Sequence, residues 1–481
     1  MEIPTNKIQR GFLGNTAKMI GVGFLMLILW LSSFFVSSLV SERMNRQQEV
    51  HQEIADKWGA PQLVAGPVLS LPFTRVTRDA NNVAQVTRET IYLLPENLNV
   101  TAKVNPQEKK RGIFSSTVYT ADVEMVADFD LASLSELTSR PADSAISWND
   151  ANLSLSLADT RGIVEPANFD WANKQVAWRS GSLLSLGVPD ESGLAKGRYY
   201  PSMDYPYTDG PIRYDNGQAV TGSGLHSAVT VTPNGPPGGE AGKYHFNFKF
   251  SVQGSRVLEF LPFGKNSNIA VNSSWPSPSF IGSLLPSESK LGTDGFTAKW
   301  QVSSLSRPYA NVWEKGGVDI STLKQSALGV NLLTSVDFYT LVDRTTKYAI
   351  LFIALTFLAF FLFEVISKIR IHPMQYILIG IALVLFYLLL LSFAENIGFM
   401  WAYILATIMT VGLVWNYSRF VLKTGNRANL IAAMLIALYV YLYIILQLEE
   451  LALLFGSVLL FLVLAIVMRV TRKIEWYSQV E

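Results

Sequence analysis

The side chains that most often carry out chemistry in proteins are scarce in this sequence. It contains no cysteine and only four histidines, His51, His226, His245 and His372. This composition excludes disulfides, cysteine-ligated zinc and thiol catalysis, and it leaves few ligands for other metals. The nucleophile motif G-x-S-x-G and the zinc motif H-E-x-x-H are both absent. We therefore predict no catalytic residues, no metal site and no cofactor.

Two weaker signals for chemistry have simpler interpretations. Residues 238–243 resemble a phosphate-binding loop, but the glycine spacing differs and Tyr244 stands where a magnesium-binding Ser or Thr is required. His226 and His245 could act as bases, although isolated histidines are more often ordinary surface residues. Neither signal supports an enzyme.

Three segments have a composition that favours a defined shape and hence a binding surface. Residues 66–72 predict a strand flanked by prolines, and residues 159–162 predict a turn held by an ion pair between Asp159 and Arg161. Residues 275–280 predict a stiff aromatic loop that could grip an extended ligand. The candidate partner-binding residues are thus Asp159 and Arg161 together with Trp275, Pro276, Pro278 and Phe280. Structural packing explains each segment as well.

The overall composition indicates a membrane protein. The 481 residues have a mean hydropathy of +0.25, and 16% of them are charged, whereas about a quarter is typical of soluble proteins. The net charge of +1 offers no cationic field for a nucleic acid, so we exclude nucleic-acid binding. The lipid bilayer is the first expected partner.

Six stretches are long and apolar enough to cross a bilayer as helices, because about 20 residues span the hydrocarbon. One is near the N-terminus and five are near the C-terminus. Their limits are residues 19–40, 348–363, 373–394, 396–418, 428–448 and 451–468, and the second could extend to residue 367. The first is too long for a typical signal peptide and lacks an A-x-A-like cleavage site, so we interpret it as an anchor.

Basic residues next to these stretches set the orientation, because Lys and Arg are retained on the cytoplasmic side. They precede the first stretch, separate the second from the third and the fourth from the fifth, and follow the sixth. Both termini are therefore predicted to be cytoplasmic, with residues 41–343 on the outer side of the membrane.

The outer segment has the pattern of a sheet. All prolines except Pro4 and Pro373 lie between Pro61 and Pro308, and apolar and polar residues alternate in several runs, at residues 123–129, 153–157, 246–252 and 296–302. One-sided strands of this kind suit antiparallel sheets packed as a sandwich. Residues 41–58 have helix-forming composition, and residues 221–242 have the composition of a mobile loop.

The predicted fold is thus a mixed membrane protein with six transmembrane helices, one N-terminal and five C-terminal, and a large, mainly antiparallel, sandwich-like β domain on the outer side of the membrane. The predicted parts are a cytoplasmic tail at 1–18, the first transmembrane helix at 19–40, a helical stalk at 41–58, the β domain at 59–343, a five-helix domain at 344–468 and a cytoplasmic tail at 469–481.

Few polar side chains lie within the predicted spans. Glu364 is the sole acid in a plausible span, and it is most simply the partner of Lys368 four residues later at the inner end of the helix. Glu364, Gln375 and Tyr387 are nevertheless candidates for an intramembrane polar site, because such residues often mark a transport pathway. Interfacial belts and hydrogen bonds between helices are the alternative explanation.

Several motifs resemble the CreD family of bacterial inner-membrane proteins. The similarity is carried by residues 343–352, 372–376 and 386–391 and by the outer segments 66–67, 159–162 and 275–280. The resemblance implies a protein of envelope integrity that responds to cell-wall stress and to β-lactam or colicin challenge, commonly under a two-component regulator. It implies no established reaction and no catalytic residues.

These observations leave three hypotheses for function. The first is a non-enzymatic envelope protein whose β domain binds a periplasmic protein or a cell-wall component. The second is a transporter of a lipid or small solute through the five clustered helices, with Glu364 as a gate. The third is a wall-remodelling hydrolase, for which no nucleophile, base or metal set is recognisable.

Overall fold

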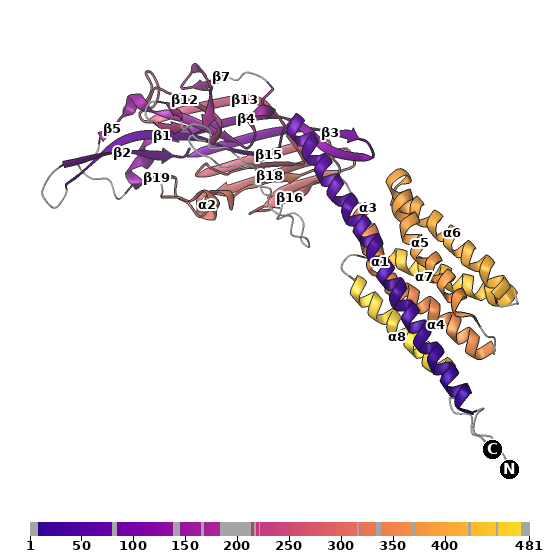
Figure 1. The fold of residues 1–481 in the computed structure, drawn as a ribbon. Coiled ribbons are helices and arrows are strands. Elements are labelled where there is room, and N and C mark those ends of the chain that lie inside the picture. Colours follow the sequence, from indigo (N-terminus) through magenta and orange to yellow (C-terminus); the bar gives the residue numbers. More distant parts are fainter. Residues whose placement is uncertain are drawn as a thin grey trace, which may run out of the picture. The chain divides into compact units, whose positions relative to one another are not determined.

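A computed structural model describes the chain at residues 8–78, 84–137, 145–164, 168–182, 213–215, 218–220, 222–314, 317–332, 338–367, 371–421, 425–448 and 451–472. The chain forms two compact units. One combines Met1–Gln48 with Val336–Glu481, and the other is Glu49–Ser335. The first unit is helical and the second is built from sheets (Figure 1).

The larger sheet, called sheet A here, has ten described strands. Its main path runs β16-β20-β14-β1-β6-β12-β9, and β2, β5 and β19 pair beside this path. The long strand β1 is central. The strands are β1 (Gln62–Arg78), β2 (Ala84–Leu93), β5 (Ala145–Ile146), β6 (Asn152–Leu157), β9 (Arg179–Ser182), β12 (Gly222–Ala228), β14 (Val257–Phe260), β16 (Ser279–Gly282), β19 (Val312–Glu314) and β20 (Leu328–Asn331).

The second sheet, sheet B, has eight described strands in the order β17-β18-β15-β3-β4-β13-β7-β8. They are β3 (Asn97–Arg111), β4 (Phe114–Asp130), β7 (Asn168–Trp171), β8 (Lys174–Ala177), β13 (Lys243–Ser255), β15 (Asn266–Ser273), β17 (Glu288–Gly292) and β18 (Gly295–Ser303). A separate hairpin joins β10 (Arg213–Asp215) and β11 (Gln218–Val220).

The connections contain short helical elements. They are the 3-10 turns η1 (Leu131–Glu136), η2 (Trp148–Asp150), η3 (Thr160–Gly162) and η5 (Ser304–Ser306) and the short helix α2 (Ile320–Lys324).

The two sheets enclose one hydrophobic core. Alternate residues of β3, β4, β13, β15 and β18 are buried in it, together with the strands at the centre of sheet A. All four runs in which the sequence alternates form strands, so the prediction of a sheet-rich domain is confirmed. Two strand pairs, β1 with β14 and β15 with β3, are parallel, and the other described pairs are antiparallel.

Two local expectations were wrong. Residues 153–157 were expected to expose their serines, but all of β6 is buried, and Ser156 forms a 2.6 Å hydrogen bond with Ser182. Residues 221–242 were expected to be a loop, but their first part forms β12, paired with β6 and β9. In both cases pairing with neighbouring strands outweighs the local composition.

The helical unit begins with α1 (Ile8–Trp58), which continues without interruption through residues 41–58, so these residues are helical as expected. After the sheets the helical part begins with α3 at Phe338, before residue 344, where the five-helix domain was expected to start. The helices of this part are α3 (Phe338–Lys347), α4 (Ala349–Ser367), α5 (Pro373–Ile397), α6 (Phe399–Val421), α7 (Gly425–Gln447) and α8 (Ala452–Thr471).

Four helices in the described residues are long and apolar enough to cross a membrane, within Gly23–Trp58, Pro373–Ile397, Phe399–Val421 and Gly425–Gln447. A fifth span results if α3 and α4, which are bent by 44°, count as one. The last apolar segment, Leu454–Arg469, is a shorter helix. The membrane character is thus supported, whereas the count of six spans stays a prediction.

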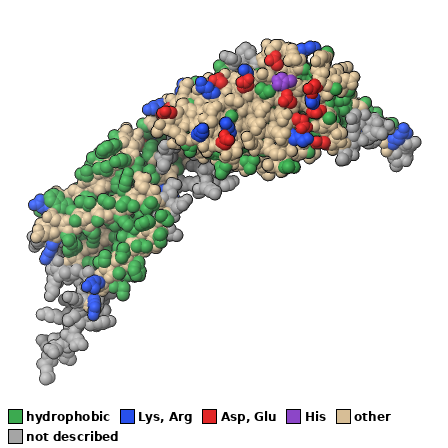
Figure 2. Space-filling view, turned by 180° about the vertical axis from the view of Figure 1, so that it is seen from behind, with side chains coloured by type: hydrophobic (Ala, Val, Ile, Leu, Met, Phe, Trp, Pro, Cys, Tyr) green, Lys and Arg blue, Asp and Glu red, His purple; other side chains and the backbone are tan. Residues whose placement is uncertain are grey.

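The surfaces of the two units differ in the way that membrane insertion requires. Apolar side chains cover the outside of the helices, and charged side chains of both signs are spread over the sheets (Figure 2). Phe35 and Phe420 are each 77% exposed, and Phe461 is 71% exposed. Exposed apolar surface of this extent on helices of this length is typical of contact with lipid.

Candidate binding groove on sheet B

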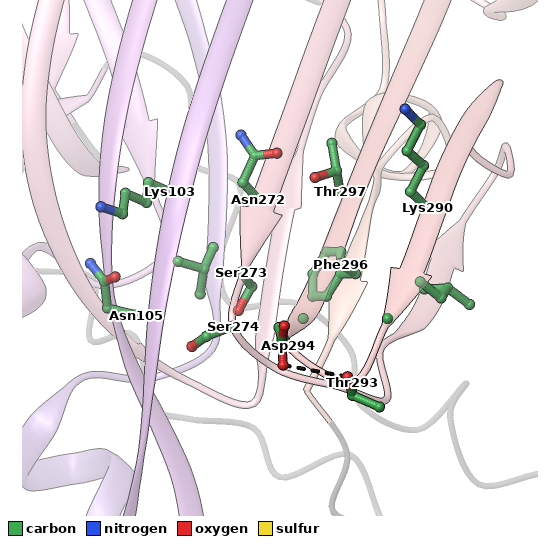
Figure 3. A pocket seen from close by; sticks show the side chains of 14 residues that line it. Lys103, Asn105, Asn272, Ser273, Ser274, Lys290, Thr293, Asp294, Phe296 and Thr297 are labelled. Atoms are coloured by element: carbon green, nitrogen blue, oxygen red, sulfur yellow. Dashed lines mark hydrogen bonds between the residues drawn. The ribbon is translucent and has the colours of Figure 1, made fainter.

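The face of sheet B that points away from the core carries polar side chains in rows across the strands. In one row Lys103 on β3 is paired with Asn272 on β15, Asn272 with Thr297 on β18, and Thr297 with Lys290 on β17. Directly paired residues of adjacent strands point to the same face of a sheet. The four side chains therefore stand side by side, with a lysine at each end (Figure 3).

This row forms part of a groove with a volume of about 620 Å³. The groove exists because the strands end at different levels: β15 ends at Ser273 and β18 begins at Gly295, whereas β3 continues to Arg111 in its hairpin with β4. Six of its fourteen lining residues have hydroxyl or amide side chains: Asn105, Asn272, Ser273, Ser274, Thr293 and Thr297. We call it the row groove.

The two lysines of the row groove differ from Lys249 and Lys299 on the same face. Lys249 forms an ion pair with Glu124 at 2.9 Å, and Lys299 lies 3.4 Å from Glu288. Lys103 and Lys290 have no ion pair among the described residues. The one carboxylate in the lining, Asp294, accepts a hydrogen bond from Thr293 at the hairpin turn. The described lining residues thus carry two positive charges and one negative charge, a net charge of +1 in an otherwise acidic domain.

The predicted aromatic loop begins where the row groove ends. Ser273 and Ser274 line the groove, and the hydroxyl of Ser273 accepts a hydrogen bond from the backbone N–H of Trp275 at 3.2 Å. Trp275 is half-buried against the core. Phe280 lies on β16 and packs edge to face on Phe296 and Trp300, with ring centroids 6.0 and 5.9 Å apart. Much of the aromatic surface is therefore used in packing.

The two prolines of this loop are more accessible. Pro276 is exposed, and Pro278 is half-buried. Neither lines the row groove, although both follow its serines directly in the chain.

Asp159 and Arg161 lie at a different place, where the end of α1 meets the sheets, and the predicted ion-paired turn is confirmed. The guanidinium Nη2 of Arg161 lies 2.9 Å from Oδ2 of Asp159. Arg161 also donates through Nη1 to the backbone oxygen of Asp56, near the end of α1. Oδ2 of Asp159 accepts from the backbone N–H of Ala60 at 3.1 Å. Gln62 donates to the backbone oxygens of Asp159 and Gln253. We call this cluster the stalk attachment.

The charge of Asp159 is stabilised in its buried position. Burial alone raises the pKa of this carboxyl, but hydrogen bonds from Arg161 and from the backbone N–H groups of Ala60 and Arg161 outweigh burial and lower the pKa below its usual value. A carboxylate bound on both oxygens in this way has little capacity left for a ligand, so its geometry is that of a structural joint.

Two of the three candidate polar residues of the helical unit, Glu364 and Gln375, lie at the junction of α4 and α5, and Tyr387 lies further along α5. Glu364 accepts hydrogen bonds from the Tyr376 hydroxyl at 3.0 Å and from the Ile371 backbone at 3.3 Å, which ties α4 to the start of α5. Gln375 accepts from the backbone of His372 in a capping box. The expected partner Lys368 lies outside the described residues.

Tyr387 differs from these two, because it is fully buried among helices. Its ring packs edge to face against Phe386 at 5.0 Å, and its hydroxyl has no hydrogen-bond partner among the described residues. The hydroxyls of Thr410 and Ser418 on α6 are likewise buried and without a partner there.

The chain is similar to a known family of membrane proteins over nearly its whole length. A family model described as "Inner membrane protein CreD" matches residues 15–477. The chain is also 32% identical over 460 residues to a protein of Escherichia coli (strain K12) named "Inner membrane protein CreD", covering 94% of this chain and 92% of that protein. The chain belongs to the CreD family.

Membership of the CreD family agrees with the resemblance found in the sequence motifs. The name places the family in the inner membrane, and the apolar helices described above agree with that location. The name describes no reaction. The match extends through both units, so the sheets as well as the helices belong to the CreD architecture.

Sequence reasoning missed the row groove, although part of its signal is visible. Residues 97–105 alternate strictly, with polar Asn97, Asn99, Thr101, Lys103 and Asn105 separated by apolar residues, and this pattern predicts an exposed polar face. The pairing of β3 with β15, which lie about 170 positions apart in the chain, has no local signal. The row could be found only once that register was known.

Proposed function

We propose that this protein is a non-enzymatic component of the bacterial inner membrane that contributes to envelope integrity and to the response to cell-wall stress, including β-lactam or colicin challenge. Its β domain lies in the periplasm and binds an envelope protein or wall component there. The observation that carries the proposal is the row groove, a hollow on the outward face of a large sheet in which two lysines have no acidic partner among the described residues.

The construction of sheet B favours binding over catalysis. The groove floor is made of side chains on central, fully paired strands, which hold a recognition surface in a fixed geometry. Among the described residues no group of three or more His, Cys, Asp or Glu side chains could hold a metal ion. The described lining residues include no histidine that could activate the hydroxyls as nucleophiles.

The proposed location requires both termini in the cytoplasm and residues 41–343 in the periplasm. Because the chain has no native cysteine, single cysteines can report it directly. We expect a membrane-impermeant maleimide to label Lys110→Cys on the β domain in spheroplasts. Arg427→Cys at the start of α7 should react only after the inner membrane is opened. The reverse pattern would place the β domain in the cytoplasm and overturn the proposal.

Binding at the row groove is testable by photo-crosslinking in living cells. A benzoylphenylalanine at position 272 or 297 should form adducts with an envelope component, because both positions lie in the middle of the row. The matched control is position 86 on β2, where Val86 is 65% exposed on the same domain. Equal adducts from all three positions would indicate random proximity and contradict the proposal.

A second candidate, transport of a lipid or small solute through the helices, is favoured by one observation. Tyr387, Thr410 and Ser418 bury hydroxyls that have no hydrogen-bond partner among the described residues, and polar groups of this kind line pathways in membrane proteins. In this alternative Glu364 acts as a gate.

Two variants separate a gate from a structural tie. Glu364→Gln removes the charge, whereas Tyr376→Phe removes the hydrogen bond to the carboxylate and keeps the charge. If Glu364 gates transport, Glu364→Gln should abolish envelope protection at unchanged protein level, and Tyr376→Phe should retain it. Equal effects of the two variants would assign Glu364 to helix packing.

A further inference from the structure

The row groove has a charge pattern with a defined spacing. Lys103 and Lys290 are separated by two intervening strands, that is by three strand spacings, so their backbones are roughly 14 Å apart. Asn272 and Thr297 fill the space between them with an amide and a hydroxyl. A complementary ligand is therefore extended across the strands, anionic at two points, and rich in hydrogen-bonding groups between those points.

The anionic character of the ligand follows from the contrast among the lysines of this face. Lys249 and Lys299 are already compensated by Glu124 and Glu288, so they offer little net attraction. Lys103 and Lys290 are exposed and have no acidic partner among the described residues. A lysine ammonium attracts a carboxylate or phosphate as a point charge, without demanding a planar geometry. Two such charges at fixed spacing select a ligand with repeated acidic groups.

The position of the groove disfavours an extended peptide. Peptides that add to sheets use a free strand edge, because their backbones must complete the ladder of hydrogen bonds. Here the floor is formed by β3, β15 and β18, whose backbones are already paired on both sides. The edge strand is β17, so a peptide added to its free edge would lie beside the row of side chains and not across it. Peptide side chains would also need apolar pockets, but Val104 and Phe296 are only 1% and 4% exposed, so Leu291, at 62%, is the one large apolar side chain that the described lining presents. Ring hydroxyls of a sugar match the amide and hydroxyl lining better.

We propose that the row groove binds an anionic glycan, a sugar chain that carries carboxylates. Lys103 and Lys290 pair with two acidic groups of the chain, and Asn272 and Thr297 hydrogen bond to the sugar hydroxyls between them. This inference rests on the proposed function, for which it names the class of the envelope component.

The test uses the full chain in nanodiscs and a defined probe, hexagalacturonate, with maltohexaose as the neutral sugar and hexaglutamate as the acidic peptide. Calorimetric titration should show binding of hexagalacturonate and no binding of the other two. Its affinity should fall when the salt is raised from about 0.05 M to about 0.5 M, because exposed ion pairs are screened.

The variant Lys103→Gln with Lys290→Gln should weaken binding of hexagalacturonate by about fivefold to tenfold, the loss expected for two exposed ion pairs. Lys103→Arg with Lys290→Arg should restore it, which excludes misfolding as the cause. The charge-matched control is Lys110→Gln with Lys174→Gln, which removes two exposed lysines of the same domain outside the groove lining. It should change the affinity by less than about twofold.

Three results would overturn the inference: absence of hexagalacturonate binding, equal binding of hexaglutamate, or equal losses in the groove variant and its control. These results can be distinguished from a failure of the proposed function. If benzoylphenylalanine at position 272 or 297 still captured an envelope protein in cells, the groove would be a binding site for a protein and only the glycan assignment would fail.

Discussion

The β domain contains two polar clusters that are organised in opposite ways. In the stalk attachment both carboxylate oxygens of Asp159 accept hydrogen bonds from within the protein, from Arg161 and from the backbone of Ala60. In the row groove Lys103 and Lys290 stand exposed without an acidic partner among the described residues. The first cluster resembles a joint that holds its own parts together, and the second resembles a surface prepared for another molecule.

The contrast shows why the sequence motif alone was ambiguous. Asp159-Thr160-Arg161-Gly162 was a candidate for partner binding because it joins opposite charges in a tight turn. The structure uses that turn to close the end of α1 onto the sheets, with Arg161 bonded to the backbone of Asp56. The same neighbourhood adds Trp58, whose indole N–H donates to the backbone oxygen of Tyr119 at 3.1 Å. A role of Asp159 and Arg161 in binding a partner stays a prediction.

The largest effect on stability is expected from Asp159→Ala. The change removes a carboxylate that is 5% exposed and leaves the N–H of Ala60 buried without its acceptor. We expect the β domain to lose about 3 kcal/mol of unfolding free energy, the lower end for breaking a buried pair because Arg161 stays partly hydrated. Hydrogen exchange of β1 and β6 peptides in the full chain measures this loss.

Asp150→Ala is the matched control for that variant. Asp150 also pairs with an arginine, Arg88 at 2.7 Å, but both side chains are well exposed. Asp150→Ala should lower the free energy of unfolding by less than about 0.5 kcal/mol. If the two variants lost similar amounts of unfolding free energy, the ion pair of the stalk attachment would contribute no more to stability than an exposed surface pair.

Close packing in the stalk attachment predicts a second effect. A Cβ at Gly162 would lie 2.3 Å from the backbone oxygen of Gln253, which belongs to a paired strand and cannot yield. We expect Gly162→Ala to destabilise the domain by about 2 kcal/mol. In contrast Gly292, in the groove lining, would place its Cβ no closer than 3.7 Å to other atoms, so Gly292→Ala should be nearly neutral. Thermal unfolding of the full chain compares the two.

Glu259 sharpens the comparison, because it is a mostly buried carboxyl without the partners that Asp159 has. Burial raises its pKa to about 7, and Lys324 opposes this only in part. Between pH 4.5 and about 7 the folded state keeps a proton that the unfolded state has lost, so the free energy of unfolding falls as pH rises through this window.

Glu259→Gln should therefore remove that dependence and stabilise the domain above pH 7, by about 1.5 kcal/mol once partial hydration is allowed for. Urea unfolding of the full chain at pH 5 and pH 8 measures it. A variant that lost stability at pH 8 would show that the Glu259 charge is favourable in the fold. Asp159 predicts the opposite slope, because its lowered pKa makes stability fall only as the solution becomes acidic.

The sequence predicted those parts of the fold whose signal is local. Alternation in residues 246–252 and 296–302 identified β13 and β18, and the lack of charge in residues 373–394 identified most of α5. It could not predict the pairing of β3 with β15 or the burial of Ser154 and Ser156, because both depend on strands distant in the chain. The row groove depends on that same long-range register, so its lysines could not be identified from the sequence. The aromatic loop beside it is one continuous segment and could be identified.

The smallest expected effect on stability is the most informative for the groove. If Lys103 and Lys290 serve recognition, nothing in the fold depends on their charge, because they form no ion pair with described residues. Lys103→Gln with Lys290→Gln should then change the unfolding free energy by less than about 0.5 kcal/mol, or raise it slightly by removing repulsion. Lys249→Gln with Lys299→Gln breaks two existing ion pairs on the same face, so it should lower the unfolding free energy by more than the groove variant does. If the groove variant lost more stability than the Lys249→Gln with Lys299→Gln variant, the charges of Lys103 and Lys290 would stabilise the fold. The row groove would then be a structural cluster like the stalk attachment.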